Sequence, residues 1–517
     1  MSTTHASLRQ VPSNLVAGQW LPIPGDNLTS HNPAHPSKVV WQGGPQADHV
    51  DAAVAAARQA LPAWSRTPLK DRARLLRRYA EIAKTRAEEV ASLITDETGK
   101  ALWETRGEAG AIGGKVEITL DPAPHAGLSR VSPFSFDLTE SRQGRCAFRP
   151  HGVMSVVGPF NFPAHLPNGH FVPALAMGNT VVFKPSDKTP AVGQILAEIM
   201  LEAIEAEGAP PGIFNLVQGG AEVSSKLTAH PDIDGILFTG SWAVGRRILE
   251  ANLDCPGRII ALELGGNNPS VVMPDADLRQ AAIEIARCAF ITTGQRCTCT
   301  RRLVAHEAIA DKLIPAIVEA ASNMRIADPR SEEPVFSGPI ISQQSRKAVL
   351  DAQTQFAKAG GEVLLESRAV EEAGEGWFVS PGIVRVDKFT AGDTNDAGCD
   401  AEVFGPLLRV TTVNSLDQAI QQANATRYGL ASSIFTRDQE TAERFLAEAR
   451  AGCVNVNAGT AGASSKLPFG GLGLSGNHRP AGSFSLDYCA YPVAQMHENG
   501  PAATIAPGMS FDDDWLN

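Results

Sequence analysis

Cysteine is scarce in this sequence, and its eight cysteines follow no regular spacing. No pair of CxxC motifs suggests zinc, and a set this sparse in 517 residues does not make a disulfide scaffold. We therefore predict no metal site. We expect most of these thiols to be small buried side chains in a reducing compartment.

Long apolar stretches are also missing. No run of about 18 or more apolar residues occurs, which argues against a membrane-spanning helix, and the first ten residues lack the apolar region of a secretory signal. The net charge of −11 disfavours nucleic acid as a partner, because phosphate binding requires a basic surface. We therefore expect a cytoplasmic protein with neither nucleic acid nor a membrane as its partner.

The composition is that of a large globular protein. Hydrophobic residues make up 43% and charged residues 20% of the chain, and the length predicts roughly two to four domains. The first third is predicted to be mainly helical. Apolar residues recur at helical spacing over 48–64 and again over 71–97, where Gly99 is placed to end the helix.

The pattern changes near residue 151, where short apolar runs begin to alternate with helical segments. The predicted strands are 153–157, 180–183, 213–217, 236–239, 259–262 and 270–273, with helices at 190–205, 221–229 and 242–252. This alternation predicts a mostly parallel, doubly wound sheet that binds ligands at the carboxyl ends of its strands. After a helix over 281–292, strands predicted at 303–306, 363–365, 407–413, 432–435 and 453–456 indicate a second α/β domain.

The segments 134–150 and 483–517 fit neither domain. Both contain strand-like runs. We predict that they form a small projecting sheet of the kind that makes subunit contacts.

Cys297 is the strongest candidate nucleophile. It follows the end of an apolar helix, in the segment Gly294-Gln295-Arg296-Cys297-Thr298-Cys299. A cysteine reacts as its thiolate, which requires a lowered pKa and access, and the neighbouring Arg296 is a candidate source of positive charge. A buried structural thiol is the alternative interpretation.

Two polar side chains that follow predicted strands are further candidates. Glu263 ends an apolar run that continues into Leu264 and two glycines. This position is compatible with a general base in a cleft and equally with a structural ion pair or a helix cap, so other signals must decide between them. The amide of Asn161 is placed to donate to a developing oxyanion, although a turn-forming Asn is the commoner case.

Two strand-to-helix segments are placed to hold a nucleotide. Gly240, Ser241 and Gly245 form a turn whose backbone N–H groups and following helix would face a phosphate. Lys184 and Asp187 follow a strand and are placed to hold ribose hydroxyls, where an acid would repel the 2′-phosphate of NADP. An ordinary strand–helix turn and a polar loop are the alternatives.

In their order along the chain, these segments resemble the aldehyde dehydrogenase family. The motifs that carry the resemblance are Phe160-Asn161-Phe162-Pro163, Lys184-Pro185-Ser186, Phe238-Thr239-Gly240-Ser241, Glu263-Leu264-Gly265-Gly266, Gly294-Gln295-Arg296-Cys297, Glu402-Val403-Phe404-Gly405-Pro406 and Pro468-Phe469-Gly470-Gly471 with Ser475-Gly476. Each motif alone is a weak signal, but all of them in one order are specific. The resemblance extends from about residue 16 to about residue 507.

The resemblance implies an NAD-dependent enzyme that oxidises an aldehyde to a carboxylic acid through a cysteine thioester. It implies Cys297 as the nucleophile, Glu263 as the general base and Asn161 as the oxyanion donor. The implied cofactor-binding residues are Lys184, Asp187, Gly240, Ser241, Gly245, Gly265, Glu402 and Phe404.

The fold implied by the resemblance is α/β with three parts. They are a Rossmann-type NAD-binding domain over 1–133 and 151–273, an α/β catalytic domain over 274–482, and an oligomerisation sheet from 134–150 and 483–517. Members of the family are homodimers or homotetramers, which is the assembly expected here.

A second set of segments is similar to the branch of the family that oxidises N-succinylglutamate 5-semialdehyde in arginine catabolism. These segments are Arg149-Pro150-His151-Gly152-Val153, Ala164-His165-Leu166-Pro167-Asn168-Gly169-His170, Gly266-Asn267-Asn268-Pro269, Cys297-Thr298-Cys299 and Gly476-Asn477-His478-Arg479-Pro480. The implied substrate has two carboxylates, for which Arg296, Arg301 and Arg479 are candidate partners, with His165, His170 and His478 behind them. A surface or structural role is the commoner one for each of these side chains, so none of them is assigned to the site. The sequence departs from the pattern in a longer N-terminal lead and in the bulky Trp242, where smaller residues are usual.

Other functions remain open at this point. The substrate could be another aldehyde or semialdehyde, or CoA rather than water could take the acyl group, which Glu263 argues against. A silent binding or structural protein on the same fold and a cysteine hydrolase with a Cys–His pair are the remaining alternatives. The candidate nucleophile, base and amide together disfavour the first, and the nucleotide-type turns disfavour the second.

Overall fold

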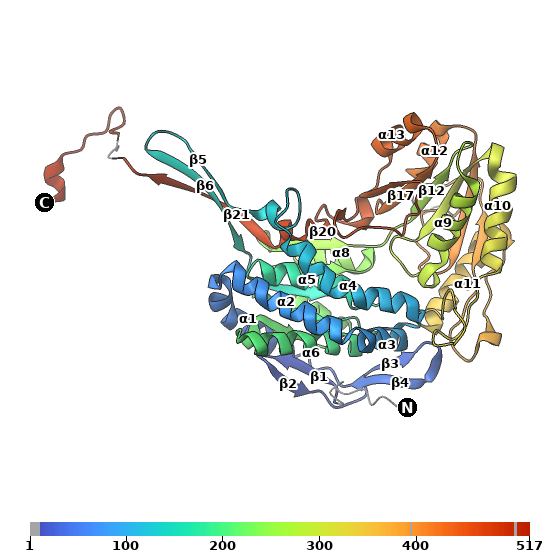
Figure 1. Ribbon diagram of the computed structural model, residues 1–517, viewed down its shortest axis with the longest axis horizontal. Helices are drawn as coiled ribbons and strands as arrows, with labels where there is room; N and C mark the ends of the chain where they lie inside the picture. Colours follow the sequence, from blue (N-terminus) through green and yellow to red (C-terminus); the bar gives the residue numbers. More distant parts are fainter. Residues whose placement is uncertain (1–10, 393–394, 501–503) are drawn as a thin grey trace.

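The computed structural model describes residues 11–392, 395–500 and 504–517, so the first ten residues of the predicted NAD-binding domain lie outside it. Two layered α/β parts lie next to each other, and a thin ribbon of strands projects from the N-terminal part (Figure 1). None of the helices within these residues is long and apolar enough to cross a membrane.

The N-terminal part is built on a seven-stranded sheet with the strand order β11-β10-β7-β8-β9-β1-β2. Its parallel strands are β7 (Val153–Val157), β8 (Thr180–Lys184), β9 (Phe214–Leu216), β10 (Gly235–Thr239) and β11 (Ile259–Glu263). The antiparallel strands β1 (Ser13–Val16) and β2 (Gln19–Pro22) extend one edge. The five predicted parallel strands are confirmed to within two residues. Each is a short run of buried apolar residues, which is the pattern that predicted it.

The helices of this part pack around the sheet (Figure 1). They are α1 (His49–Arg66), α2 (Leu69–Thr85), α3 (Ala87–Thr98), α4 (Leu102–Leu120), α5 (His165–Ala176), α6 (Pro190–Glu207), α7 (Ala221–Ala229) and α8 (Trp242–Ala251). A small hairpin of β3 (Leu28–Asn32) and β4 (His35–Gly43) lies beside α3 and α6.

The single helix predicted over 71–97 is wrong, because the chain breaks into α2 and α3 at Arg86. The Arg86 side chain bonds to Glu89 at 2.8 Å and to Glu198 on α6 at 3.0 Å. The apolar stripe runs through the break because both helices face the same core. As predicted, Gly99 ends the second helix, in the left-handed conformation with φ +73°.

The C-terminal part contains a second seven-stranded sheet, in the order β14-β15-β16-β13-β12-β17-β18. Its strands are β12 (Asn268–Val272), β13 (Thr300–His306), β14 (Glu362–Leu365), β15 (Gly382–Arg385), β16 (Leu407–Val413), β17 (Ala431–Phe435) and β18 (Cys453–Val456). Its helices are α9 (Leu278–Phe290), α10 (Glu307–Ser322), α11 (Gln343–Lys358), α12 (Leu416–Ala423) and α13 (Gln439–Glu448).

The strand predicted at 270–273 belongs to this second sheet and not to the first. β12 pairs with β13 and β17, so the two sheets separate between Glu263 and Asn268 rather than at residue 273. The two glycines after β11 carry the chain across, and Asn268 then bonds to backbone groups of both neighbouring strand regions. Continuous apolar runs look alike in both sheets, so periodicity alone did not reveal the crossing.

The projecting ribbon is a three-stranded antiparallel sheet of β5 (Phe134–Asp137), β6 (Arg142–Pro150) and β21 (Ala490–Glu498). It unites the two segments that fitted neither domain. Large apolar side chains remain exposed on it, with Phe134 57%, Phe136 54% and Met496 73% accessible. The exposed apolar surface fits the predicted subunit contact, which remains a prediction. A short pair, β19 (Pro468–Phe469) and β20 (Ala481–Gly482), lies nearer the body.

Candidate active site

A cavity of about 190 Å³ opens between the two α/β parts. Six polar or titratable side chains among those that line it are Lys115, His165, His170, Glu263, Arg296 and Cys297. The predicted nucleophile and the predicted base therefore face the same space, although they lie on different parts of the fold.

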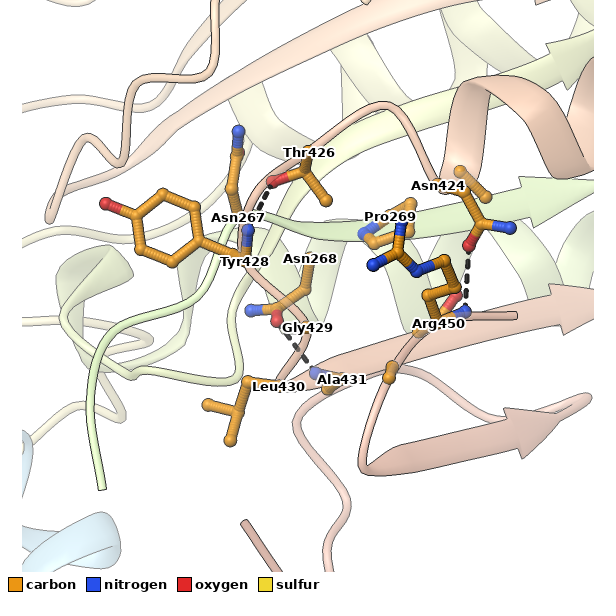
Figure 2. Close-up of a pocket in the computed structure, with 13 residues that line it drawn as sticks. Asn267, Asn268, Pro269, Asn424, Thr426, Tyr428, Gly429, Leu430, Ala431 and Arg450 are labelled. Atoms are coloured by element: carbon orange, nitrogen blue, oxygen red, sulfur yellow. Dashed lines mark hydrogen bonds between the residues drawn. The ribbon is translucent and has the colours of Figure 1, made fainter. Parts of the chain in front are cut away.

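A second pocket, of only about 10 Å³, lies beside β17, and the predicted site residues are not among those that line it (Figure 2). Its wall includes Asn268, whose side-chain oxygen accepts the Ala431 N–H at 3.0 Å. The amide nitrogen of Asn268 donates to the carbonyls of Cys297 at 2.7 Å and Cys299 at 2.8 Å. Asn268 therefore fixes the cysteine loop, a role that its place in a motif did not disclose.

The loop before Cys297 has an unusual backbone. Thr292, Thr293 and Gly294 all have left-handed φ values, of 56°, 52° and 70°. Two β-branched residues in this region are strained and persist only where the surroundings fix them. A Cβ at Gly294 would lie 2.1 Å from the Gly405 carbonyl carbon, so the loop can approach its neighbour only with glycine there.

Arg301, at the start of β13, joins the loops around the site. Its buried guanidinium donates to the backbone carbonyls of Gly266 (3.1 Å), Gly294 (3.2 Å), Arg296 (3.0 Å) and Val403. Of the two roles considered for Arg301, the structural one fits, because its donors are used inside the protein.

Arg296 lines the cavity but is already paired. Its guanidinium lies 2.7 Å from the buried carboxylate of Glu104 and donates to the Thr292 hydroxyl at 2.7 Å. Arg301 is a positive charge that acts to lower the thiol pKa of Cys297, whereas the charge of Arg296 is paired with Glu104.

The Cys297 thiol is half-buried and sits among carboxylates. Burial, followed by the charges of Glu263 and Glu402, raises its pKa to about 12. The sulfur is therefore a thiol at neutral pH.

Glu263 ends β11 as a buried carboxyl group, 3% exposed. Within the described residues its Oε1 has no hydrogen-bond partner. Burial raises its pKa to about 8, while the charge of Lys115 and the Ala481 N–H act in the opposite direction. An orphaned carboxyl oxygen with a pKa near neutrality can exchange a proton with a ligand or water.

Asn161 is buried and tied to the cysteine loop. Its side-chain amide donates to the Gln295 carbonyl at 3.0 Å, and its backbone carbonyl accepts from the buried Lys100 ammonium at 2.9 Å. The amide nitrogen carries a second N–H, which is held in place by the first hydrogen bond. Its use as an oxyanion donor remains a prediction.

Lys184 and Asp187 lie where predicted, at the carboxyl end of β8. The Lys184 ammonium is buried and donates to the Gly219 carbonyl at 2.9 Å. Burial lowers its pKa to about 8, against the opposing charge of Asp187. A buried ammonium with donors to spare at a strand end suits a hydroxyl-rich ligand.

The turn after β10 leads directly into α8. Ser241 is exposed and caps the helix, accepting from the Val244 N–H at 3.4 Å. A Cβ at Gly245 would lie 2.9 Å from the Leu264 side chain, so this glycine lets the helix pack closely on the sheet. Gly240 leaves room for the Phe238 ring, and the bulky Trp242 packs against the apolar core beneath the helix. The use of this helix N-terminus as an anion site remains a prediction.

Gly265, Glu402 and Phe404 form a contact between the two parts. A Cβ at Gly265 would lie 1.9 Å from the Glu402 carboxylate, which accepts the Gly266 N–H at 3.0 Å. The Phe404 ring meets Phe160 edge-on at 5.9 Å. Gly265 thus makes space for Glu402 rather than for a ligand directly.

Lys115, on α4, is the site residue that sequence reasoning missed. Its ammonium lies in the cavity wall, buried, and donates to the Gly482 carbonyl at 2.6 Å and the Ser485 hydroxyl at 3.0 Å. The signal that the sequence offered is a lysine within a helix that is otherwise rich in small residues, which indicates that the lysine packs closely against other elements.

The structure thus places a thiol and a buried carboxyl group at one cavity beside a doubly wound sheet, an arrangement that suits an enzyme with a nucleophile and a base. The family model described as "Aldehyde dehydrogenase family" matches residues 20–492. The chain belongs to the aldehyde dehydrogenase family, and the expected fold class and enzyme class are confirmed.

Relatives and solved structures resemble the chain over nearly its whole length. It is 46% identical to N-succinylglutamate 5-semialdehyde dehydrogenase 2 of Caulobacter vibrioides, over 95% of this chain and 97% of that protein. It is 42% identical to N-succinylglutamate 5-semialdehyde dehydrogenase of Novosphingobium aromaticivorans, over 94% and 99%. A solved NAD-dependent aldehyde dehydrogenase from Sinorhizobium meliloti superposes with a TM-score of 0.86 at 31% identity, covering 95% of each chain.

Replacing Arg301 by Lys should destabilise the protein by on the order of 3 kcal/mol, because one ammonium cannot satisfy carbonyls on three loops. The shift of the urea unfolding midpoint measures this. Arg444→Lys, on the exposed face of α13, is the matched control and should leave the midpoint unchanged. Equal midpoints for the two variants would show that Arg301 does not hold the loops.

Alkylation of Cys297 in the protein without cofactor should accelerate about tenfold for each pH unit between about pH 7 and pH 10, because the thiolate fraction rises tenfold per unit below the pKa. Mass spectrometry of the Cys297 peptide after timed iodoacetamide treatment measures the rate. A plateau reached below about pH 8 would contradict the raised pKa.

Proposed function

We propose that the protein is an NAD-dependent dehydrogenase that oxidises N-succinylglutamate 5-semialdehyde to N-succinylglutamate through a thioester on Cys297. The observation that carries the reaction type is that Cys297 and Glu263 line one cavity. The support for the substrate is the name carried by both relatives described above, each at more than 40% identity over nearly the whole chain.

The chain's own groups carry out the covalent steps. The Cys297 thiol gives its proton to water, and its sulfur forms a bond to the aldehyde carbon while the carbonyl oxygen becomes an alkoxide. The second N–H of Asn161 stabilises that alkoxide, since the amide is held rigidly beside the cysteine loop. After oxidation to the thioester, Glu263 takes a proton from water, whose oxygen bonds to the acyl carbon as the sulfur leaves.

The residues present fit an NAD cofactor. Lys184 and Asp187 would hold ribose hydroxyls, and the open N-terminus of α8, with Gly240, Ser241 and Gly245, would hold the pyrophosphate. When bound, NAD accepts the hydride that leaves the substrate carbon. Asp187 favours NAD over NADP, because its charge would repel a 2′-phosphate.

The carboxylates of the substrate need polar partners in the cavity wall besides the arginines named as candidates. Arg301 is used inside the fold, and Arg479 is exposed and donates to a neighbouring carbonyl. Hydroxyl groups of Ser464 and Ser465 line the cavity and are available to a carboxylate. Glu402 and Phe404 would border the nicotinamide side of the cleft.

The partners and location follow the family pattern. The enzyme acts on a small aldehyde, in the cytoplasm, as a homodimer or homotetramer. The support for the assembly is the apolar surface of the β5, β6 and β21 sheet, which a second copy of the chain would cover.

The substrate proposal is tested by NADH formation across a panel of aldehydes. N-succinylglutamate 5-semialdehyde should give the highest kcat/KM, and succinate semialdehyde and aliphatic aldehydes lower values. NADP in place of NAD should reduce the rate. A simple aliphatic aldehyde with an equal or higher kcat/KM would overturn the substrate assignment, while leaving the enzyme class intact.

The roles of the two central residues are tested by Cys297→Ala and Glu263→Gln. The first variant should form no NADH, because the nucleophile is gone. The second should give one burst of NADH and then turn over about 10²–10⁴-fold more slowly, because hydrolysis of the thioester loses its base. Stopped-flow absorbance measures both phases. Normal steady-state turnover by Glu263→Gln would remove Glu263 from the mechanism.

A further inference from the structure

The cavity holds a charged side chain that neither the sequence motifs nor the proposed steps use. Lys115 reaches it from α4, a helix that contributes no predicted catalytic residue. Buried lysines are rare unless they are paired or functional, so its presence in this wall requires an explanation.

The hydrogen-bond partners of Lys115 hold its ammonium group in place, and neither of them carries a negative charge. Its two hydrogen-bond partners, the Gly482 carbonyl at 2.6 Å and the Ser485 hydroxyl at 3.0 Å, are uncharged. The Ser485 hydroxyl itself donates to Gly482 at 2.7 Å, so its lone pairs remain directed to the lysine. An ammonium has three donors, and these two bonds leave one for the cavity.

Glu263 is the carboxyl group on which this charge acts. Both side chains line the same cavity, both are almost fully buried, and the Glu263 oxygen Oε1 lacks a hydrogen-bond partner among the described residues. Opposite charges in a poorly solvated space interact more strongly than in water. The charge of each lowers the cost of ionising the other.

The other titratable groups around this pair are His165, His170, Cys297, Cys453, Tyr488 and Cys489. Burial lowers the pKa of both histidines, that of His170 to about 3, and raises the pKa of the thiols and of the phenol. Near neutral pH all of them are uncharged. Arg296 also lines the cavity, but its guanidinium is paired with the Glu104 carboxylate at 2.7 Å. Among these described groups, the cation that faces Glu263 without a carboxylate partner of its own is therefore Lys115.

We propose that Lys115 is a positioning residue whose ammonium keeps Glu263 ionisable as the base for thioester hydrolysis. This inference rests on the proposed function, because it assigns Lys115 a role through Glu263. Lys115 forms no bond to substrate in this proposal, and no proton needs to leave it during turnover.

The test is the pH dependence of thioester hydrolysis in Lys115→Met, followed after the NADH burst by chemical quench and intact-protein mass spectrometry. Removing the positive charge raises the pKa of Glu263 further, so the base ionises only at higher pH. The midpoint should move up by about one pH unit, which lowers the rate at pH 7 about tenfold. The rates of variant and wild type should converge at high pH, and the NADH burst should keep its amplitude.

Two further variants separate charge from packing. Ser485→Ala keeps the lysine but removes one of its acceptors, so a smaller shift in the same direction is expected even if Lys115→Met folds poorly. Lys347→Met, an exposed lysine on α11 paired with Asp351, is the matched control and should show the wild-type midpoint. A uniform loss of rate at every pH, an unshifted midpoint in both cavity variants, or a shift in the control would overturn the proposal.

Glu263→Gln distinguishes failure of this inference from failure of the proposed function. If Glu263→Gln hydrolyses the thioester at the wild-type rate, the base assignment itself is wrong. If Glu263→Gln is slow and Lys115→Met retains the wild-type midpoint, only the role of Lys115 is wrong. In the Glu263→Gln background, Lys115→Met should cause no further pH shift, because the ionising group is absent.

Discussion

The geometry of the cleft depends on one buried guanidinium. Arg301 donates to backbone carbonyls in the crossing between the sheets, in the cysteine loop and in the loop that carries Glu402. Carbonyls on separate loops are thereby held by a single rigid, planar group, so none of the loops can shift alone. The left-handed backbone at 292–294 and the tight contact of Gly294 with Gly405 persist because these loops are fixed together. Cys297, Gly265 and Glu402 owe their relative positions to this network.

The pKa values of the titratable groups in the cleft are set by burial and by the charged groups that lie next to them. Burial, followed by the charges of two carboxyl groups, raises the pKa of Cys297, and this limits its oxidation, since oxidation proceeds through the thiolate. The same burial brings Glu263 and Lys115 toward a common pKa of about 8, at which small changes in occupancy alter their charge. A protonated thiol and a carboxyl group whose pKa is close to neutral pH suit a reaction of this kind. Its first step adds the nucleophile to the substrate, and its last step activates water.

Sequence reasoning worked where the signal is local and failed where the cause is distant. The five parallel strands of the first sheet, the Gly99 helix stop and the motif residues around Cys297 and Glu263 are set by short apolar runs and turn glycines. The break at Arg86 depends on Glu198 in another helix, and the passage of β12 into the second sheet depends on Asn268 reaching two other strands. Likewise, the sequence left a substrate role and a structural role open for Arg301, because the carbonyls that it binds lie on distant loops. Lys115 belongs to no motif because its partners lie hundreds of positions further along the chain.

The most direct measurement of the central claim is the mass of the enzyme during turnover. Glu263→Gln, mixed with N-succinylglutamate 5-semialdehyde and NAD and quenched in acid, should carry one acyl group, which raises the mass of the protein by that of the aldehyde less two hydrogens. Peptide mapping should place it on Cys297, with one NADH formed per adduct. Formation of NADH with Cys297 unmodified, or an adduct on another residue, would contradict the account.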